Sequence, residues 1–188
     1  MAHDLLFNTD NDDDWSINPA ARTAAAKTKA LPLDFTATER KVLKQLEPST
    51  AAFAVNLVGW ARDQGIPARL SHTAIYSPKD TAEAYDRGLS QIKPGKLDWH
   101  NVGRAIHVVV YRPDGTTIDA SAYPPIGAYA RSQGGEWLGD KPIRGKYGVI
   151  YDTVHFEYHP GMDLGSYRKS ELARREFAQA QKRARSYA

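Results

Sequence analysis

The chain of 188 residues contains no cysteine, which excludes disulfide frameworks and every zinc site built on thiolates. Any metal site in this protein must therefore use His, Asp or Glu. No apolar run reaches the ~20 residues that a membrane helix needs, so a membrane is not an expected partner. The first residues, MAHDLLFNTDNDDDW, lack a basic segment followed by an apolar one, so we expect no secretory signal peptide.

A large excess of one charge is also missing. With 25 Lys and Arg against 22 Asp and Glu, the formal net charge is +3. This small excess suits an anionic surface such as cell wall or nucleic acid, but it does not select between them. Hydrophobic residues make up 41% of the chain, an ordinary share for a soluble globular protein, and the length allows one domain with a real core.

Composition divides the chain into three predicted parts. Residues 1–36 join the acidic cluster DNDDD to the stretch AARTAAAKTKALP, which indicates an extended arm or a disordered tail. Residues 37–162 are predicted to form the compact domain. Residues 163–188 contain Leu172 and Phe177 among many Arg and Lys, which predicts a basic amphipathic helix. The polar face of that helix is either solvated or contacts a partner, and nucleic acid is the weakest of the candidate partners.

Apolar periodicity and turn residues predict the elements of the domain. Helices are predicted over 37–47, 49–64, 78–88 and 123–131. Strands are predicted over 67–75, 104–112, 116–120 and 153–158, with loops over 89–99 and 134–148. Ser77 followed by Pro78 is the clearest start signal, because Ser caps a helix N-terminus and Pro fits its first position.

Three histidines occupy positions that a sheet can bring together. His100 precedes the strand predicted over 104–112, and His107 lies on that strand after a glycine that permits a sharp turn. Alternation directs His107 away from the most aliphatic face of its strand. It also places His155 and Glu157 on one face of the next predicted strand.

Three imidazoles and a water molecule would form a catalytic zinc site, with Zn–N distances of about 2.0–2.1 Å and one open position. Zinc lowers the pKa of bound water to about 7 and so supplies a nucleophile. A carboxylate outside the ligand set must then take the proton, and Asp152, just before His155, is placed for that role. Glu157 would orient a ligand. A single histidine on a strand is more often structural, so spacing alone leaves both interpretations open.

Three segments together resemble a known family. They are D-W-H-N-V-G-R-A-I-H over 98–107, G-G-E-W-L-G-D over 134–140 and D-T-V-H-F-E over 152–157. Their order and spacing are similar to those of the VanY-type D-alanyl-D-alanine carboxypeptidases and the phage L-alanyl-D-glutamate endolysins. These families share a fold with VanX and the hedgehog signalling domain. The resemblance implies an α+β fold with a small, mostly antiparallel sheet flanked by helices.

The resemblance also implies an activity and the residues that perform it. The activity is that of a zinc metallopeptidase acting on the stem peptides of peptidoglycan. His100 and His155 would be zinc ligands, Asp152 the catalytic base and Glu157 a supporting residue.

Two positions depart from the family pattern. The second ligand of the family is Asp, where this chain has His107. An imidazole can bind zinc, but replacing a carboxylate with a neutral imidazole raises the net charge at the metal by one unit. The family carries Arg where this chain has Tyr76, whose hydroxyl can donate one hydrogen bond to an oxyanion without a positive charge. Arg69, Arg87 and Arg104 are the candidates to replace the missing arginine.

The predicted setting is a bacteriophage. The protein would be an endolysin or a virion-associated wall-degrading protein, located in the virion or in the host cytoplasm before release to the cell wall. Residues 1–36 and 163–188 would then contact other virion proteins. The alternative is a structural or binding module of the virion, for example in the tail, that keeps the peptidase fold without its activity. The departures at His107 and Tyr76 are the features that separate the two hypotheses.

Overall fold

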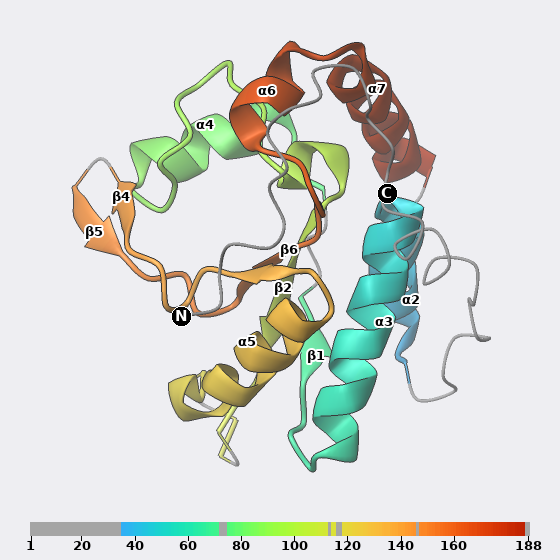
Figure 1. Cartoon of the computed structure of the whole chain (residues 1–188), viewed down its shortest axis with the longest axis vertical. Helices are drawn as coiled ribbons and strands as arrows, with labels where there is room; N and C mark the ends of the chain where they lie inside the picture. Colours follow the sequence, from blue (N-terminus) through green and yellow to red (C-terminus); the bar gives the residue numbers. More distant parts are fainter. Residues whose placement is uncertain (1–34, 72–74, 113, 116–117, 146, 187–188) are drawn as a thin grey trace, which may run out of the picture.

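A computed structural model of the chain describes residues 35–71, 75–112, 114–115, 118–145 and 147–186. Within them, helices surround a small sheet whose strand pairs are all antiparallel, which confirms the predicted α+β class (Figure 1). No helix of these residues is long and apolar enough to cross a membrane. The arm predicted over 1–36 lies outside the described residues, except for Phe35 and Thr36.

Helices α2 (Ala37–Gln45) and α3 (Pro48–Asp63) begin at residues whose side chains satisfy free backbone N–H groups. Before α2, the Thr36 hydroxyl accepts from the Glu39 N–H, and the Glu39 carboxylate accepts from the Thr36 N–H. Before α3, the Glu47 carboxylate accepts from two N–H groups of the first turn, and proline occupies the first helical position. Both helices therefore lie close to their predicted ranges.

Four strands form the central sheet, in the order β1-β2-β6-β3. They are β1 (Arg69–Leu70), β2 (Ala105–Val109), β3 (Glu136–Trp137) and β6 (His155–Glu157). The register between β2 and β6 sets His107 opposite His155. Because side chains alternate across a strand, Ile106 and Phe156 point to the opposite face, where both are buried. One face of the sheet thus joins the core, and the other carries the histidines.

The core lies between this sheet and two helices, α3 and α5 (Tyr123–Ser132). Leu57 of α3 and Ile126 of α5 are fully buried together with Ile106 and Val108 of β2. The Tyr123 hydroxyl donates to the Val108 carbonyl and accepts from the backbone N–H two residues later, both at 3.0 Å. The strand that carries His107 is therefore fixed from its core side.

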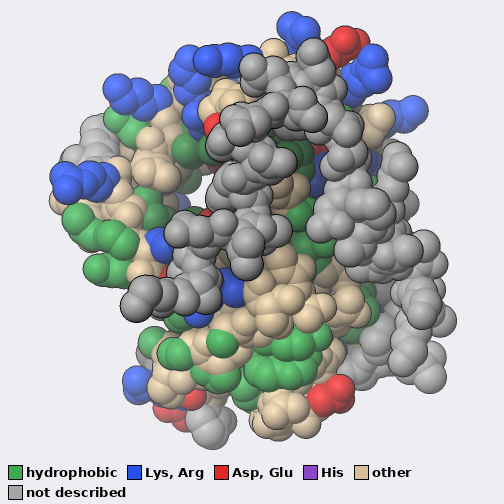
Figure 2. Space-filling view, viewed as in Figure 1, with side chains coloured by type: hydrophobic (Ala, Val, Ile, Leu, Met, Phe, Trp, Pro, Cys, Tyr) green, Lys and Arg blue, Asp and Glu red, His purple; other side chains and the backbone are tan. Residues whose placement is uncertain are grey.

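The other elements surround the face that carries the histidines (Figure 1). They are α4 (Pro78–Asp86), the 3-10 turn η1 (His100–Val102), the hairpin of β4 (Ile143–Gly145) and β5 (Gly148–Ile150), α6 (Leu164–Lys169) and α7 (Glu171–Ser186). Helix α7 packs against η1 and α2. Exposed Lys and Arg side chains gather along the upper edge of the molecule, over α6 and α7 (Figure 2).

Three local predictions are wrong. The loop predicted over 134–148 contains β3 and the β4–β5 hairpin, because strands of two or three residues are too short to show alternation. The strand predicted over 116–120 is reduced, in its described residues, to one bridge at Ile118 and the start of the turn η2 (Ala120–Ala122). The single C-terminal helix is interrupted at Ser170, which has extended backbone and whose hydroxyl caps α7.

Gly103 shapes the turn between η1 and β2. Its φ of 77° is left-handed, and a Cβ there would lie 3.0 Å from the backbone nitrogen of Glu47. We expect Gly103→Ala to lower the free energy of unfolding by about 1–2 kcal/mol through backbone strain alone, and further by displacing Glu47. Gly65→Ala is the matched control, since Gly65 has a φ of 76° and no atom within 4 Å of its Cβ position. Urea unfolding measures both losses, and equal losses would contradict the close contact at Gly103.

Candidate metal centre

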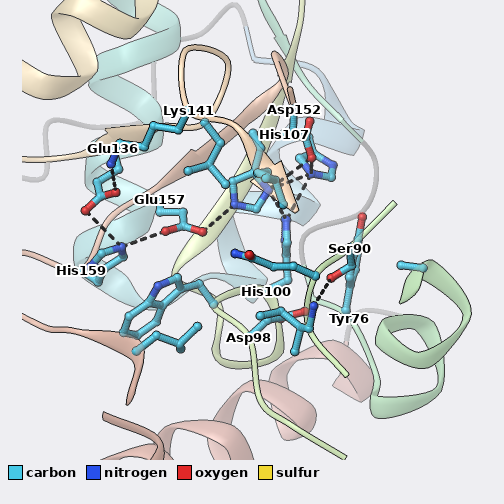
Figure 3. A pocket seen from close by; sticks show the side chains of 18 of the residues that line it. Tyr76, Ser90, Asp98, His100, His107, Glu136, Lys141, Asp152, Glu157 and His159 are labelled. Carbon is cyan, nitrogen blue, oxygen red and sulfur yellow. Dashed lines mark hydrogen bonds and ion pairs between the residues drawn. The ribbon is translucent and has the colours of Figure 1, made fainter. Parts of the chain in front are cut away.

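Three imidazole nitrogens converge beside the sheet. His100 comes from η1, His107 from β2 and His155 from β6. His100 Nε2 lies 3.2 Å from His107 Nε2 and 3.3 Å from His155 Nδ1, and the latter two atoms are also 3.3 Å apart. Figure 3 shows His100 and His107 at the wall of a pocket, which His155 also lines. The structure thus brings together the three residues predicted as metal ligands, which we call the histidine cluster.

Hydrogen bonds alone do not explain the spacing of the histidine cluster. A ring nitrogen either carries a proton and donates, or holds a lone pair and accepts. Among three such atoms in mutual contact, at least one pair must be two donors or two acceptors, which repel each other. A cation accepts all three lone pairs, and tetrahedral zinc with Zn–N distances of about 2.0–2.1 Å separates its ligand nitrogens by about 3.3–3.4 Å. The cluster can therefore hold a metal ion, and its donor set and spacing fit zinc.

The surroundings of His107 and His155 favour the binding of a cation by their ring nitrogens. Burial and the two neighbouring imidazoles hold the pKa of His107 well below its usual value, so it offers a lone pair at neutral pH. Burial on its own would also lower the pKa of His155, but the hydrogen bond and charge of Glu157 raise it. His155 Nε2–H donates to Glu157 Oε1 at 2.9 Å, and Nδ1 is left facing the cluster. A carboxylate that fixes the far nitrogen of a histidine is typical of metal sites.

His159 belongs to the site, although the sequence analysis assigned it no role. Its Nε2 lies 2.9 Å from Glu157 Oε2 and its Nδ1 lies 3.0 Å from the Met162 carbonyl oxygen. Both partner atoms are oxygens that can accept a hydrogen bond from the ring. Trp99 stacks on this ring at a centroid distance of 4.2 Å. Glu157 is therefore held between His155 and His159, and Figure 3 shows its contact with His159. The remaining two histidines of the chain lie outside the described residues.

This placement of Glu157 should make the protein sensitive to acid. Burial alone would raise the pKa of Glu157, but His155 and His159 lower it from 4.5 to about 2. Because the folded-state pKa lies below the unfolded value, the stabilisation is complete above pH 4.5 and is lost as the pH falls toward 2. Across that window, the free energy of unfolding of the metal-free wild type should fall by about 3 kcal/mol more than that of Glu157→Gln. Urea unfolding at a series of pH values measures the difference, and parallel curves would contradict it.

Asp152 lies next to the histidine cluster without joining it. Its Oδ2 is 3.8 Å from His155 Nδ1 and 4.0 Å from His107 Nε2. Burial raises the pKa of this carboxyl group, and the charge of His155 partly offsets the rise. A carboxylate with a raised pKa is better matched to accept and return a proton near neutral pH. Asp152 therefore lies beside the histidine cluster as a carboxyl group with a raised pKa.

Tyr76 covers one face of His100. The two rings stack with a centroid distance of 4.4 Å and an interplanar angle of 15°. Burial, together with the nearby carboxylates of Asp152 and Asp98, raises the pKa of Tyr76 to about 12. The hydroxyl therefore stays protonated at neutral pH and remains a hydrogen-bond donor at the wall of the pocket.

The turn that carries His100 is fixed by two polar side chains. Asp98 Oδ1 accepts from the Asn101 N–H at 2.8 Å, and Asn101 Oδ1 accepts from the Asp98 N–H at 2.7 Å. The Asn101 amide nitrogen also donates to the Tyr76 carbonyl and to the Thr81 hydroxyl, both at 2.9 Å. Asp98 therefore accepts from a backbone N–H within η1, and its other carboxylate oxygen accepts from the Thr81 hydroxyl of α4 at 3.3 Å, which connects η1 to α4.

The histidine cluster opens into a cleft of about 1280 Å³. This volume exceeds the ~300–1,000 Å³ of common small-molecule sites, so the cleft can hold an extended substrate. Arg87, at the end of α4, lines its wall, as does Lys141. Arg69, Arg87 and Arg104 are the candidates to replace the arginine that the similar families carry at the position of Tyr76. Of these three, only Arg87 lines this cleft. Arg104 is paired with Glu176, and Arg69 lies on β1.

No protein-family model and no curated protein matches this chain. Among solved structures, the L-Ala D-Glu endopeptidase ChiX of Serratia marcescens is similar, with a TM-score of 0.51 and 21% sequence identity. The match covers 66% of this chain and 89% of that chain. At this identity the likeness shows a shared fold, and it supports the α+β architecture expected from the sequence.

Proposed function

We propose that this protein is a zinc-dependent peptidase that hydrolyses the stem peptides of peptidoglycan. One observation carries the proposal: three ring nitrogens 3.2–3.3 Å apart share the wall of a cleft with a carboxylate that does not belong to the cluster. The fold likeness to an L-Ala D-Glu endopeptidase supports the choice of substrate. His100, His107 and His155 would hold the metal.

The chain's own residues would divide the reaction between them. Zinc bound to such nitrogens acts as a Lewis acid toward a peptide carbonyl and activates water. Asp152 takes the proton of the attacking water and returns it to the leaving amine, so the peptide bond is replaced by a carboxylate and a free amine. Tyr76, a neutral donor beside His100, donates to the developing oxyanion. Glu157 keeps the His155 ring in the orientation that exposes Nδ1.

A structural or binding role in a virion is the second candidate function. One observation favours it: Tyr76 stacks on His100 at the position where the similar families carry a cationic side chain. The bacteriophage setting and the contacts of residues 1–36 and 163–188 with other virion proteins are proposals that rest on the sequence resemblance.

Digestion of purified peptidoglycan tests the proposed function. The purified chain with zinc should release new amino groups, and a chelator should stop the release. Mass spectrometry of the products identifies the bond: cleavage between L-Ala and D-Glu leaves a new glutamate amino terminus, whereas carboxypeptidase action releases free D-Ala. A zinc-loaded chain that releases no more amino groups than its chelated control would contradict the proposal and favour the structural role.

A further inference from the structure

Arg104 lies between two residues of the histidine cluster and ties their backbone together. Its N–H donates to the Trp99 carbonyl at 2.8 Å, which closes the turn that carries His100. Its carbonyl accepts from the Tyr158 N–H at 2.8 Å, which continues the pairing of β2 with the chain beyond β6. A shift of Arg104 would therefore move both His100 and His107.

The guanidinium group of Arg104 is held by the C-terminal helix. Arg104 is only 7% exposed, and it forms a two-point ion pair with Glu176 of α7, with N–O distances of 2.7 and 2.6 Å. The Tyr167 hydroxyl of α6 donates to the same carboxylate at 2.6 Å. Glu47, at the start of α3, is the next carboxylate, 3.7 Å away. A buried guanidinium needs such partners, because an uncompensated charge in the interior is strongly destabilising.

Other contacts of α6 and α7 surround the same turn. Arg168 Nε donates to the Leu97 carbonyl at 2.7 Å, just before the turn. The Tyr167 ring packs on Trp99 at a centroid distance of 4.7 Å. Ala173 of α7 is buried in the cluster of apolar residues that contains Val102 and Ala105. The C-terminal segment therefore contacts the chain before, within and after η1.

We infer that the α6–α7 segment is a structural part of the metal centre, and that Glu176 is a positioning residue that acts on His100 and His107 through Arg104. This inference rests on the metal site of the proposed function and extends it to a helix whose sequence indicates only a basic surface. The hydrogen bonds of the Glu176 side chain among the described residues go to Arg104 and Tyr167, so its effect would pass through Arg104 and the backbone of the His100–His107 segment.

The chain offers a matched control for Glu176→Gln. Glu39 is also a buried carboxylate paired with an arginine, Arg62, at 2.7 Å, and it caps α2 and accepts from the Leu70 N–H. The hydrogen bonds of its side chain among the described residues go to Thr36, Arg62 and Leu70, none of which belongs to η1 or to the histidine cluster. Glu39→Gln therefore removes a comparable buried ion pair whose arginine lies outside the His100–His107 segment, and it reports the effect of lost stability.

The experiment measures zinc affinity by chelator competition and the absorption spectrum of bound Co²⁺, with urea unfolding in parallel. Glu176→Gln should weaken zinc binding about 10–100-fold, the usual cost of losing an outer contact of a metal site, and should change the Co²⁺ spectrum. Glu39→Gln should lose stability but keep the wild-type affinity within about twofold and the wild-type spectrum. Tyr167→Phe removes only one hydrogen bond to Glu176 and should also weaken zinc binding. If Glu176→Gln does not fold, the zinc affinity of Tyr167→Phe tests the inference instead.

Provided that the wild type binds zinc, either of two results would overturn this inference and leave the proposed function intact. One is wild-type affinity and spectrum in folded Glu176→Gln or, failing that, in Tyr167→Phe. The other is an equal loss of affinity in Glu39→Gln, which would assign the effect to global stability. A wild type that binds no zinc overturns the proposed function first, and the inference with it.

Discussion

Asp152→Asn should reduce peptide hydrolysis about 10²–10⁴-fold, the usual contribution of a positioned general base. Asparagine has nearly the same shape but cannot take the proton of the attacking water. Zinc binding should be unchanged, because the carboxylate lies 3.8–4.0 Å from the nearest ring nitrogens and outside their mutual contacts. The initial rate of amino-group release from peptidoglycan, at equal zinc content, measures the effect.

The matched control for this variant is Asp140→Asn. Asp140 is an exposed carboxylate paired with Arg131 at 2.7 Å, and it does not line the cleft. Its replacement should leave the rate within about twofold, since exposed ion pairs contribute little. Equal rates for the wild type and Asp152→Asn would remove the general base from the proposal, and an inactive wild type would favour the structural role.

His155→Ala should abolish the stabilisation of the protein by zinc. At a free zinc concentration of 100 times Kd, binding stabilises the folded wild type by about 2.7 kcal/mol. For a chain of this size, that corresponds to a Tm increase of about 5–10 °C. The variant keeps only two of the three converging nitrogens, so its Tm should not respond to zinc in this range. Thermal unfolding monitored by circular dichroism, with and without zinc, measures both shifts.

His159→Ala is the control for His155→Ala, because it removes a nearby imidazole that is not a predicted zinc ligand. His159 belongs with Glu136 and Glu157 to a second group that could hold a metal ion, but it lies outside the histidine cluster, so this variant should keep a zinc-dependent rise in Tm. A rise of the same size in His155→Ala would contradict the assignment of His155 as a ligand.

The fold class was predicted from the family resemblance, and the gathering of the histidines from that resemblance together with strand alternation. Alternation along 104–112 and 153–158 fixes which face each side chain takes, and both segments contain strands of the central sheet. Alternation does not set register, so the pairing of His107 with His155, 48 residues away, could not be derived from spacing. The Ser77-Pro78 signal placed the start of α4 correctly because capping is local chemistry.

The missed parts of the site depend on contacts between distant segments, with one exception. His159 continues the alternation of His155 and Glu157, so the period of two could have indicated it. Arg104 and Glu176 lie 72 residues apart; Arg104 was a candidate only for the missing arginine, and Glu176 looks in sequence like an ordinary surface charge. Nothing local shows that folding buries both and joins them.

The metal content of the purified protein is the most direct test of the central claim, that the histidine cluster is a zinc site. Elemental analysis after removal of loosely bound metal should find about one zinc per chain, since the cluster offers one set of three nitrogens. A His100→Ala/His107→Ala/His155→Ala variant, prepared in the same way, should contain none. Zinc-free wild-type protein that remains zinc-free after incubation with the metal, or a triple variant that binds as much zinc as the wild type, would contradict it.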